Sequence, residues 1–280
     1  MEYQDLVNQF KESYRQIFEV QKSEGSISWA QHKTSNPNEL VSPTIPFIGK
    51  NYFAQKTKIL LYASAENLVG YNGYLDDDSY AINRHRSWFD TKSYDFFPKV
   101  HLKPIEDGSL VIVLRYICEK LGIEMPDTPK DFLESISFAN FGKFSIQPKE
   151  GKNTNIDYPN DKQKMDCSMP YVKVDLELLH PDIIVMFKSI YGTESQNINA
   201  IKGNAQIIRI YQINAGTVNR LISKKNSNKD ENELSPVIRE WYDRSHFNQN
   251  GFTRTTRENY LSVFTYLDNI LKQQIIARAV

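Results

Sequence analysis

Apolar and polar positions form two kinds of pattern along this chain, one typical of helices and one typical of buried strands. Residues 3–23 carry apolar side chains at helical spacing, which predicts an amphipathic helix. Short apolar runs predict four strands, at 59–62, 136–140, 183–187 and 207–212. The third run, Ile-Ile-Val-Met-Phe, has no polar position, which is typical of a central strand covered on both faces.

Helical patterns fill the segments between these strands. "DGSLVIVLRYICEKLG" predicts a helix that Gly122 ends in the left-handed conformation, and "PYVKVDLELLH" predicts another. Two closing helices are expected within residues 235–278, whereas residues 147–165 are polar and are predicted to be irregular. Strands that alternate with helices predict a single α/β domain over residues 1–280, with its core in residues 56–223. We expect a three-layer α/β/α fold around a mainly parallel, four-stranded sheet.

Composition limits the chemistry that this chain can carry. Lys and Arg number 34 and Asp and Glu number 34, so a net charge of zero gives no global argument for nucleic acid but allows a local basic face. Two cysteines are too few for a disulfide framework or an all-cysteine iron–sulfur cluster, and no Cys/His cluster has zinc-ligand spacing. No apolar run approaches the ~20 residues of a membrane span. We therefore expect a cytoplasmic protein with no cofactor, no metal and no membrane segment.

Polar side chains follow each predicted strand, and this is where a site is expected. In an open parallel sheet, ligands bind beyond the carboxyl ends of the strands. The residues that follow the strands are rich in amides and include Ser64, Glu66, Asn67, Asn140, Lys143, Gln212 and Asn214. An amide carries a donor and an acceptor on one planar group, which matches the edge of a nucleobase. The pattern therefore favours a nucleobase site.

The order of these segments resembles the uracil-DNA glycosylase superfamily over roughly residues 58–223. "FANFGKF" is similar to the second motif of that family, with Asn140 in the asparagine position, and "LELLHPDIIVMF" is similar to its helix-to-strand junction. "RIYQINAGTVN" stands where the last, histidine-bearing motif is expected, but it contains no histidine. The first motif also departs from the family, because Ala65 occupies the usual Asp or Asn position.

The resemblance implies a DNA glycosylase, which flips a damaged or modified base out of the stack and hydrolyses its bond to C1′. In that role Glu66, or Asn67 as second choice, would position water or stabilise the cation. Neutral donors on Gln212 and Asn214 would stabilise charge on the leaving base. Base binding would involve Ser64, Asn140 and Tyr71, with Trp88 or Phe89 as further stacking candidates.

Single-stranded or damaged DNA is the partner that this interpretation predicts. Its backbone would be contacted by basic residues that follow the second and fourth strands, namely Lys143, Arg220, Lys224 and Lys225. A solvated charged loop over residues 224–235 is the alternative interpretation of the latter part of this set.

Two other functions remain open. A protein of the same fold could bind a nucleobase or nucleic acid without cleaving it, which the Ala65 and histidine departures favour. A serine hydrolase is the less favoured alternative, since Ser64 follows a strand as in a nucleophile elbow. That turn requires glycine at both flanking positions, where this chain has Tyr62 and Glu66.

Overall fold

The computed structural model describes residues 3–66, 108–146, 161–190, 196–213, 215–244 and 257–276. The chain divides into two compact units, each built from two separate stretches of sequence. Unit 1 comprises Met1–Thr91 and Ile136–Arg209, and unit 2 comprises Lys92–Ser135 and Ile210–Val280. Each unit therefore needs residues from early and late in the chain, and the single domain over residues 1–280 stays a prediction.

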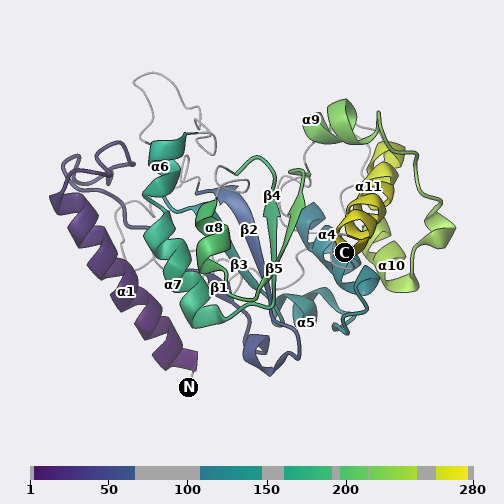
Figure 1. Cartoon of the computed structure of the whole chain (residues 1–280), viewed down its shortest axis with the longest axis horizontal. Coiled ribbons are helices and arrows are strands. Elements are labelled where there is room, and N and C mark those ends of the chain that lie inside the picture. Colours follow the sequence, from purple (N-terminus) through teal and green to yellow (C-terminus); the bar gives the residue numbers. More distant parts are fainter. Residues whose placement is uncertain are drawn as a thin grey trace. The chain divides into compact units, whose positions relative to one another are not determined.

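A five-stranded sheet, which lies in unit 1 apart from the last residue of β5, has the strand order β1-β3-β2-β4-β5 (Figure 1). The strands are β1 (Phe47–Ile48), β2 (Ile59–Ala65), β3 (Ser137–Gly142), β4 (Ile183–Phe187) and β5 (Gln206–Ile210). The middle strand β2 pairs in parallel with β3 and with β4, whereas β1 runs antiparallel to β3. The predicted α/β class and mainly parallel sheet are thereby confirmed.

All four predicted strands form, but the predicted strand number of four is wrong. The strand that the sequence pattern did not predict is β1, which consists of Phe47 and Ile48, both buried. Such a short strand has no room for the alternation that marks a strand in a sequence, so the pattern could not show it. The strand ends also shift, because β2 continues to Ala65 and β5 stops at Ile210, two residues before Gln212.

The helices of unit 1 come from segments that flank its strands. They are α1 (Tyr3–Ser23), α6 (Lys162–Asp166), α7 (Met169–Leu179), α8 (Gln196–Ile201) and the 3₁₀ helix η1 (Tyr52–Ala54). The predicted helix over 3–23 is confirmed as α1, which packs beside α7 (Figure 1). The prediction of irregular structure up to residue 165 is wrong at its end, where Asp161 caps α6 through its side chain.

Unit 2 is helical in the residues that the structure describes. Its elements are α4 (Gly108–Lys120), α5 (Pro129–Leu133), α9 (Ala215–Thr217), the π-helix η3 (Val218–Ile222), the 3₁₀ helix η4 (Glu231–Glu233), α10 (Pro236–Arg244) and α11 (Arg257–Ile276). The two predicted closing helices are thus α10 and α11, and both contact α4. As predicted, Gly122 follows α4 in the left-handed conformation, with φ of 68°. Cys118 is fully buried in α4.

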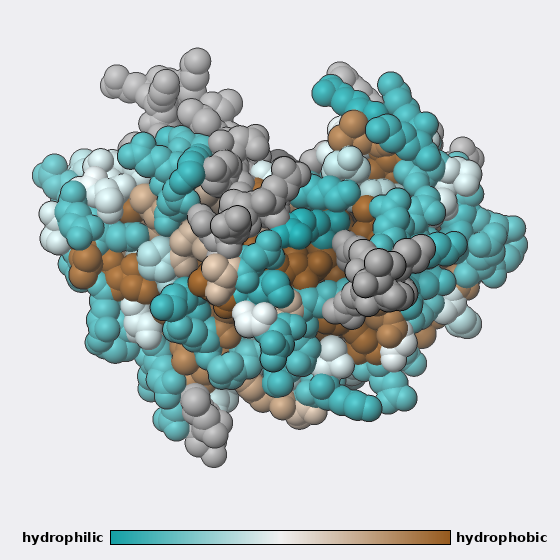
Figure 2. Space-filling model, in the orientation of Figure 1, coloured by the Kyte–Doolittle hydropathy of each residue, from teal (hydrophilic) through white to brown (hydrophobic). Residues whose placement is uncertain are grey.

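Among the residues that the structure describes, few large hydrophobic side chains are exposed. On the face drawn in Figure 2, hydrophilic residues cover most of the surface, and hydrophobic ones show in smaller patches between them. Among the described residues, the exposed large hydrophobic side chains are Val20 in α1, Phe53 in η1 and Leu221 in η3. Single exposed side chains of this kind are ordinary on protein surfaces. No helix in the described segments has both the length and the apolar character needed to cross a membrane.

Candidate functional site

The carboxyl ends of β2 and β3 lie side by side and bring two predicted site residues together. The parallel register pairs Ala63 with Asn140, and two residues further on it pairs Ala65 with Gly142. Because Glu66 directly follows β2, it emerges at the same edge of the sheet as Asn140. The Glu66 N–H donates to the Gly142 carbonyl over 2.8 Å, which extends the pairing one residue beyond β2.

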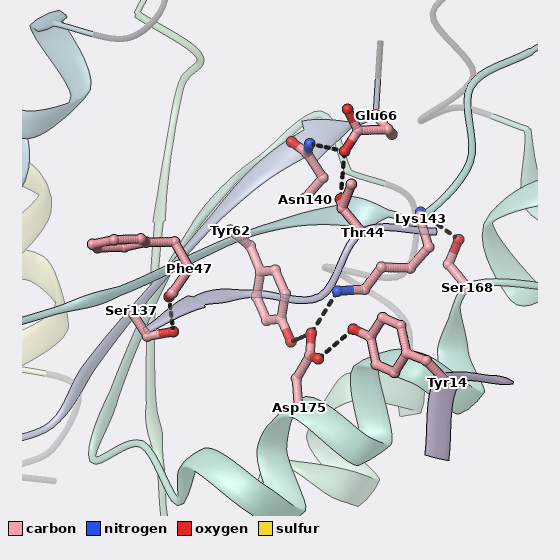
Figure 3. A network of polar contacts seen from close by, with 10 residues as sticks. All are labelled: Tyr14, Thr44, Phe47, Tyr62, Glu66, Ser137, Asn140, Lys143, Ser168 and Asp175. Carbon is pink, nitrogen blue, oxygen red and sulfur yellow. Dashed lines mark hydrogen bonds and ion pairs between the residues drawn. The ribbon is translucent and has the colours of Figure 1, made fainter. Parts of the chain in front are cut away.

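Two neutral donors hold the Glu66 carboxylate (Figure 3). Asn140 Nδ2 donates to Glu66 Oε2 over 2.9 Å, and Thr44 Oγ1 donates to the same oxygen over 2.8 Å. Glu66 is 2% exposed and Asn140 is 9% exposed. Hydrogen bonds to a carboxylate offset part of the cost of burying its charge. We call Glu66, Asn140 and Thr44 the carboxylate cluster.

The carboxylate cluster has a defined chemistry. Because Asn140 Nδ2 faces Glu66, the orientation of the amide is fixed and its carbonyl oxygen points elsewhere. A carboxylate and an amide held in this way can accept hydrogen bonds from a ligand N–H or from a water molecule. Both side chains sit at the ends of paired strands, which position groups more rigidly than loops do. The cluster therefore suits recognition of a small planar ligand with N–H groups.

Small residues end the middle strand of the sheet beside this cluster. Ala63, Ser64 and Ala65 are all half-buried, although β2 has neighbours on both sides. Side chains alternate along a strand, so Ala63 and Ala65 share a face with Asn140 and Ser64 points to the opposite face. Ser64 Oγ is buried and has no hydrogen-bond partner in the described structure. The base-binding role of Ser64 stays a prediction.

The remaining predicted residues of the base site are not part of the carboxylate cluster. Outside the described residues lie Asn67, Tyr71, Trp88, Phe89 and Asn214. Gln212 is half-buried and belongs to unit 2, whereas Glu66 and Asn140 belong to unit 1. The convergence of Gln212 on the same ligand therefore stays a prediction.

Lys143 does not occupy the surface position that contact with DNA would require. Its ammonium lies 2.6 Å from Asp175 Oδ2, and the two side chains are 1% and 0% exposed. A phosphate cannot reach an ammonium at that depth, so the prediction that Lys143 contacts the DNA backbone is wrong. The physical reason is local: the strand alternation directs Lys143 toward the face covered by α7, where a carboxylate neutralises it.

The Lys143–Asp175 pair is the centre of a second polar cluster, which we call the ion-pair cluster (Figure 3). Asp175 also accepts hydrogen bonds from Tyr14 over 2.5 Å and from Tyr62 over 2.8 Å. Burial lowers the pKa of Lys143, and the Asp175 carboxylate opposes that shift. Burial raises the pKa of Tyr14 and of Tyr62 well above the usual tyrosine range, and the adjacent carboxylate raises them further. Four segments, α1, β2, α7 and the end of β3, thus meet at one carboxylate.

Sequence reasoning missed Asp175. A signal did exist, because Asp175 stands among the buried positions of α7, with Tyr171, Val172, Leu176 and Leu179. A carboxylate on the apolar face of a helix requires a buried partner, since an isolated buried charge costs too much free energy. That rule indicates a partner but does not identify Lys143 as the partner.

The other predicted contacts with the DNA backbone lie in unit 2. Arg220 in η3 and the following Lys224 and Lys225 are exposed, so these three side chains are accessible to an anion. Lys229 behaves differently, because its ammonium lies 2.6 Å from Asp268 and 3.5 Å from Glu233. The charged loop predicted over residues 224–235 is therefore tethered to α11 at Lys229, and it also contains η4.

Metal chemistry finds no support in the described segments. Within them, no group of three or more His, Cys, Asp or Glu side chains is arranged to hold a metal ion. The expectation that the whole protein holds no metal stays a prediction, because part of the chain lies outside those segments.

Comparison with known proteins does not identify a family for this chain. No protein-family model matches the sequence, and no curated protein matches it. The resemblance to uracil-DNA glycosylases therefore depends on the order of the sequence motifs, and it remains a hypothesis.

Proposed function

We propose that the carboxyl-end edge of β2 and β3 binds a nucleobase and that the protein is a DNA glycosylase of the uracil-DNA glycosylase type. The observation that supports this proposal best is the hydrogen bond between Asn140 and Glu66 at the ends of adjacent parallel strands. The three-layer α/β/α arrangement of that family is part of the same proposal.

In the proposed reaction, Asn140 reads the edge of a flipped base and Glu66 acts beneath the sugar. The bond from C1′ to the base nitrogen breaks, and the bonding electron pair leaves with the base. The Glu66 carboxylate stabilises the resulting oxocarbenium ion and orients the water whose oxygen forms the new bond to C1′. The proton of that water passes to solvent or to the departing base. Neutral donors on Gln212 and Asn214 stabilise the charge on the base.

DNA is the proposed partner, held by its backbone at Arg220, Lys224 and Lys225 of unit 2. These exposed cations supply the sequence-independent part of the affinity. Flipping a base costs a few kcal/mol in a duplex and least in single-stranded or mismatched DNA. We therefore expect single-stranded and mismatched substrates to react fastest.

Binding of a base without cleavage is the second candidate, and one observation favours it. Glu66 is 2% exposed and already accepts two hydrogen bonds, which suits a structural carboxylate as well as a catalytic one. The serine hydrolase loses support, because a nucleophilic serine needs a base within hydrogen-bond reach and Ser64 Oγ has no partner in the described structure.

Release of free base from a panel of oligonucleotides that each carry one lesion tests this proposal. We expect the protein to release at least one base, and Glu66→Gln to lower the rate by a factor of roughly 100 or more while DNA affinity stays nearly unchanged. Gln keeps the shape of the side chain and removes its charge. Glu177→Gln, at an exposed carboxylate paired with Lys173, is the matched control and should leave the rate unchanged.

Three outcomes of this assay separate the candidates. Equal rates for wild type and Glu66→Gln would remove Glu66 from the mechanism. Retained binding of oligonucleotides with no release from any lesion would favour the binding protein. Absence of both binding and release would overturn the nucleobase proposal.

A further inference from the structure

One peptide group joins the two clusters of unit 1. It is the peptide between Gly142 and Lys143, directly after β3. Its carbonyl accepts the Glu66 N–H over 2.8 Å, and its N–H donates to Ser168 Oγ over 2.9 Å. The side chain of Lys143 then runs to Asp175 over 2.6 Å. The orientation of this peptide is thus tied directly to the backbone of Glu66.

The strand that carries Glu66 is tied to the same carboxylate. Tyr62 lies four residues before Glu66 on β2, and its hydroxyl donates to Asp175 over 2.8 Å. The Lys143 ammonium lies 5.5 Å from the ring centre of Tyr14 and 5.6 Å from that of Tyr62, within the range of cation–π attraction. Asp175 therefore holds β2 through Tyr62 and the end of β3 through Lys143 (Figure 3).

Stability alone is a weak reason for such an arrangement. Taking two charges out of water is costly, and neutral groups that pack equally well often replace a buried ion pair without loss of stability. What a neutral group does not replace is a directional, charge-assisted link between two particular side chains. The link to Asp175 starts from Lys143, and the peptide between Gly142 and Lys143 carries the carbonyl that accepts the Glu66 N–H.

We propose that Lys143 is a positioning residue, whose buried pair with Asp175 fixes the peptide that holds Glu66 and so fixes the geometry of the carboxylate cluster. Lys143 touches neither Glu66 nor a ligand in this scheme; it acts through the Gly142 carbonyl. The inference relies on the proposed function only in treating the carboxylate cluster as the binding site.

Amide hydrogen exchange at Glu66 tests the proposal, because that N–H makes the bond in question. The first variant combines Lys143→Met with Asp175→Asn. It removes both charges and keeps side chains of similar length, and the Asn amide can still pair with the hydroxyls of Tyr14 and Tyr62. The second variant, Ser168→Ala, removes only the hydroxyl that accepts the Lys143 N–H. Ser262→Ala is the matched control, since Ser262 is a fully buried serine in α11.

We expect exchange at the Glu66 amide to be at least about tenfold faster in both test variants than in wild type, because a local opening exposes that bond. Exchange at a core amide of unit 2, Leu267, should change much less. The Ser262→Ala control should leave the Glu66 amide unchanged. Equal exchange at Glu66 in wild type and in the double variant, or equal acceleration at Glu66 and Leu267, would overturn the proposal. The serine variant removes the other anchor of the same peptide, so it shows how far the Glu66 amide depends on that peptide, whereas the double variant tests the ion pair itself.

A second readout separates positioning from the proposed function. If the protein releases a base, the same two variants should lower the rate of release more than they lower DNA affinity. A wild type that releases no base leaves the exchange result standing and defeats only the glycosylase proposal. Unchanged exchange together with base release by wild type would defeat the positioning role and leave the glycosylase proposal intact.

Discussion

At the scale of single residues, the buried pair makes a prediction about stability. Lys143→Met leaves the Asp175 carboxylate buried without its cation, so we expect the free energy of unfolding to fall by about 3–5 kcal/mol. Adding Asp175→Asn removes the uncompensated charge and should recover most of that loss. Urea unfolding of wild type, the single variant and the double variant measures both steps.

An exposed ion pair provides the control for this cycle. Lys162 and Asp166 pair over 2.7 Å on α6, with side chains 62% and 38% exposed. Lys162→Met should change the free energy of unfolding by less than about 1 kcal/mol, because solvent screens such pairs. A double variant that is no more stable than Lys143→Met would contradict the argument, since it would show that the charge on Asp175 is not the source of the loss.

The same residues show which parts of the site the sequence could predict. Glu66 and Asn140 could be found because each follows a strong strand signal, and parallel strands place their carboxyl ends at one edge. The environment of Lys143 could not be found, because lysine is rarely buried and its partner lies 32 residues away in the sequence, on α7. A pattern of single residues carries no information about such pairs.

At the scale of elements, two helix ends adopt the same backbone conformation with different residues. Gly122 follows α4 with φ of 68°, and His180 follows α7 with φ of 46°. A Cβ added at Gly122 would meet no atom within 4 Å, so the cost of Gly122→Ala is conformational and should be about 1–2 kcal/mol. His180→Gly removes the corresponding strain from an exposed position and should stabilise the protein by up to about 1 kcal/mol.

Thermal and urea unfolding of these two variants checks the prediction. The opposite signs serve as mutual controls, because both changes act at a helix end without removing a buried side chain. Destabilisation by His180→Gly comparable to that of Gly122→Ala would show that the His180 side chain, and not the backbone, stabilises the end of α7.

Elements were predictable in proportion to the length of their periodic signal. The 21 residues of α1 and the continuous apolar run of β4 are long enough to define a helix and a strand. The two residues of β1 and the five residues of α6 are too few to define an element by their pattern. Pairing with β3 determines the structure of β1, and the Asp161 cap determines the start of α6. The ends of β2, β3 and β5 differ from the predicted ends by two or three residues, because a few residues at the end of a strand carry too little pattern to define its end.

At the scale of the whole molecule, the two units share one kind of interior contact, a buried tyrosine that donates to a carboxylate. Tyr62 donates to Asp175 in unit 1, and Tyr116 donates to Asp268 over 2.7 Å in unit 2. Burial raises the pKa of both tyrosines above the usual range, and their carboxylates add to the shift. Both tyrosines therefore stay protonated in the folded protein at pH values where they ionise in the unfolded chain.

This difference makes stability fall in alkaline solution. Above about pH 10 the folded state binds more protons than the unfolded state, so the free energy of unfolding falls by up to about 1.4 kcal/mol per pH unit for each such tyrosine. Lys143 acts with the opposite sign, because its pKa is lowered by burial and the unfolded chain holds the extra proton. The contribution of Lys143 to the slope fades as the pH rises past the ordinary lysine pKa of about 10.4, because the unfolded chain then loses that proton too. Above that range the tyrosines set the slope.

Urea unfolding across a series of pH values from about 9 to about 11.5 measures the slope. Tyr62→Phe and Tyr116→Phe should each lower stability at neutral pH by about 1–3 kcal/mol, because a buried carboxylate (Asp175) or a partly buried one (Asp268) loses a donor. Each should also make the fall of the unfolding free energy with pH shallower, by the contribution of about one proton, because phenylalanine has no proton to retain. Phe132→Leu, at a buried aromatic residue of unit 2 that has no ionisable proton, is the control and should leave the slope unchanged. A slope that is the same in wild type and in both test variants would show that these tyrosines ionise alike in the folded and unfolded protein, and it would contradict the argument that burial raises their pKa.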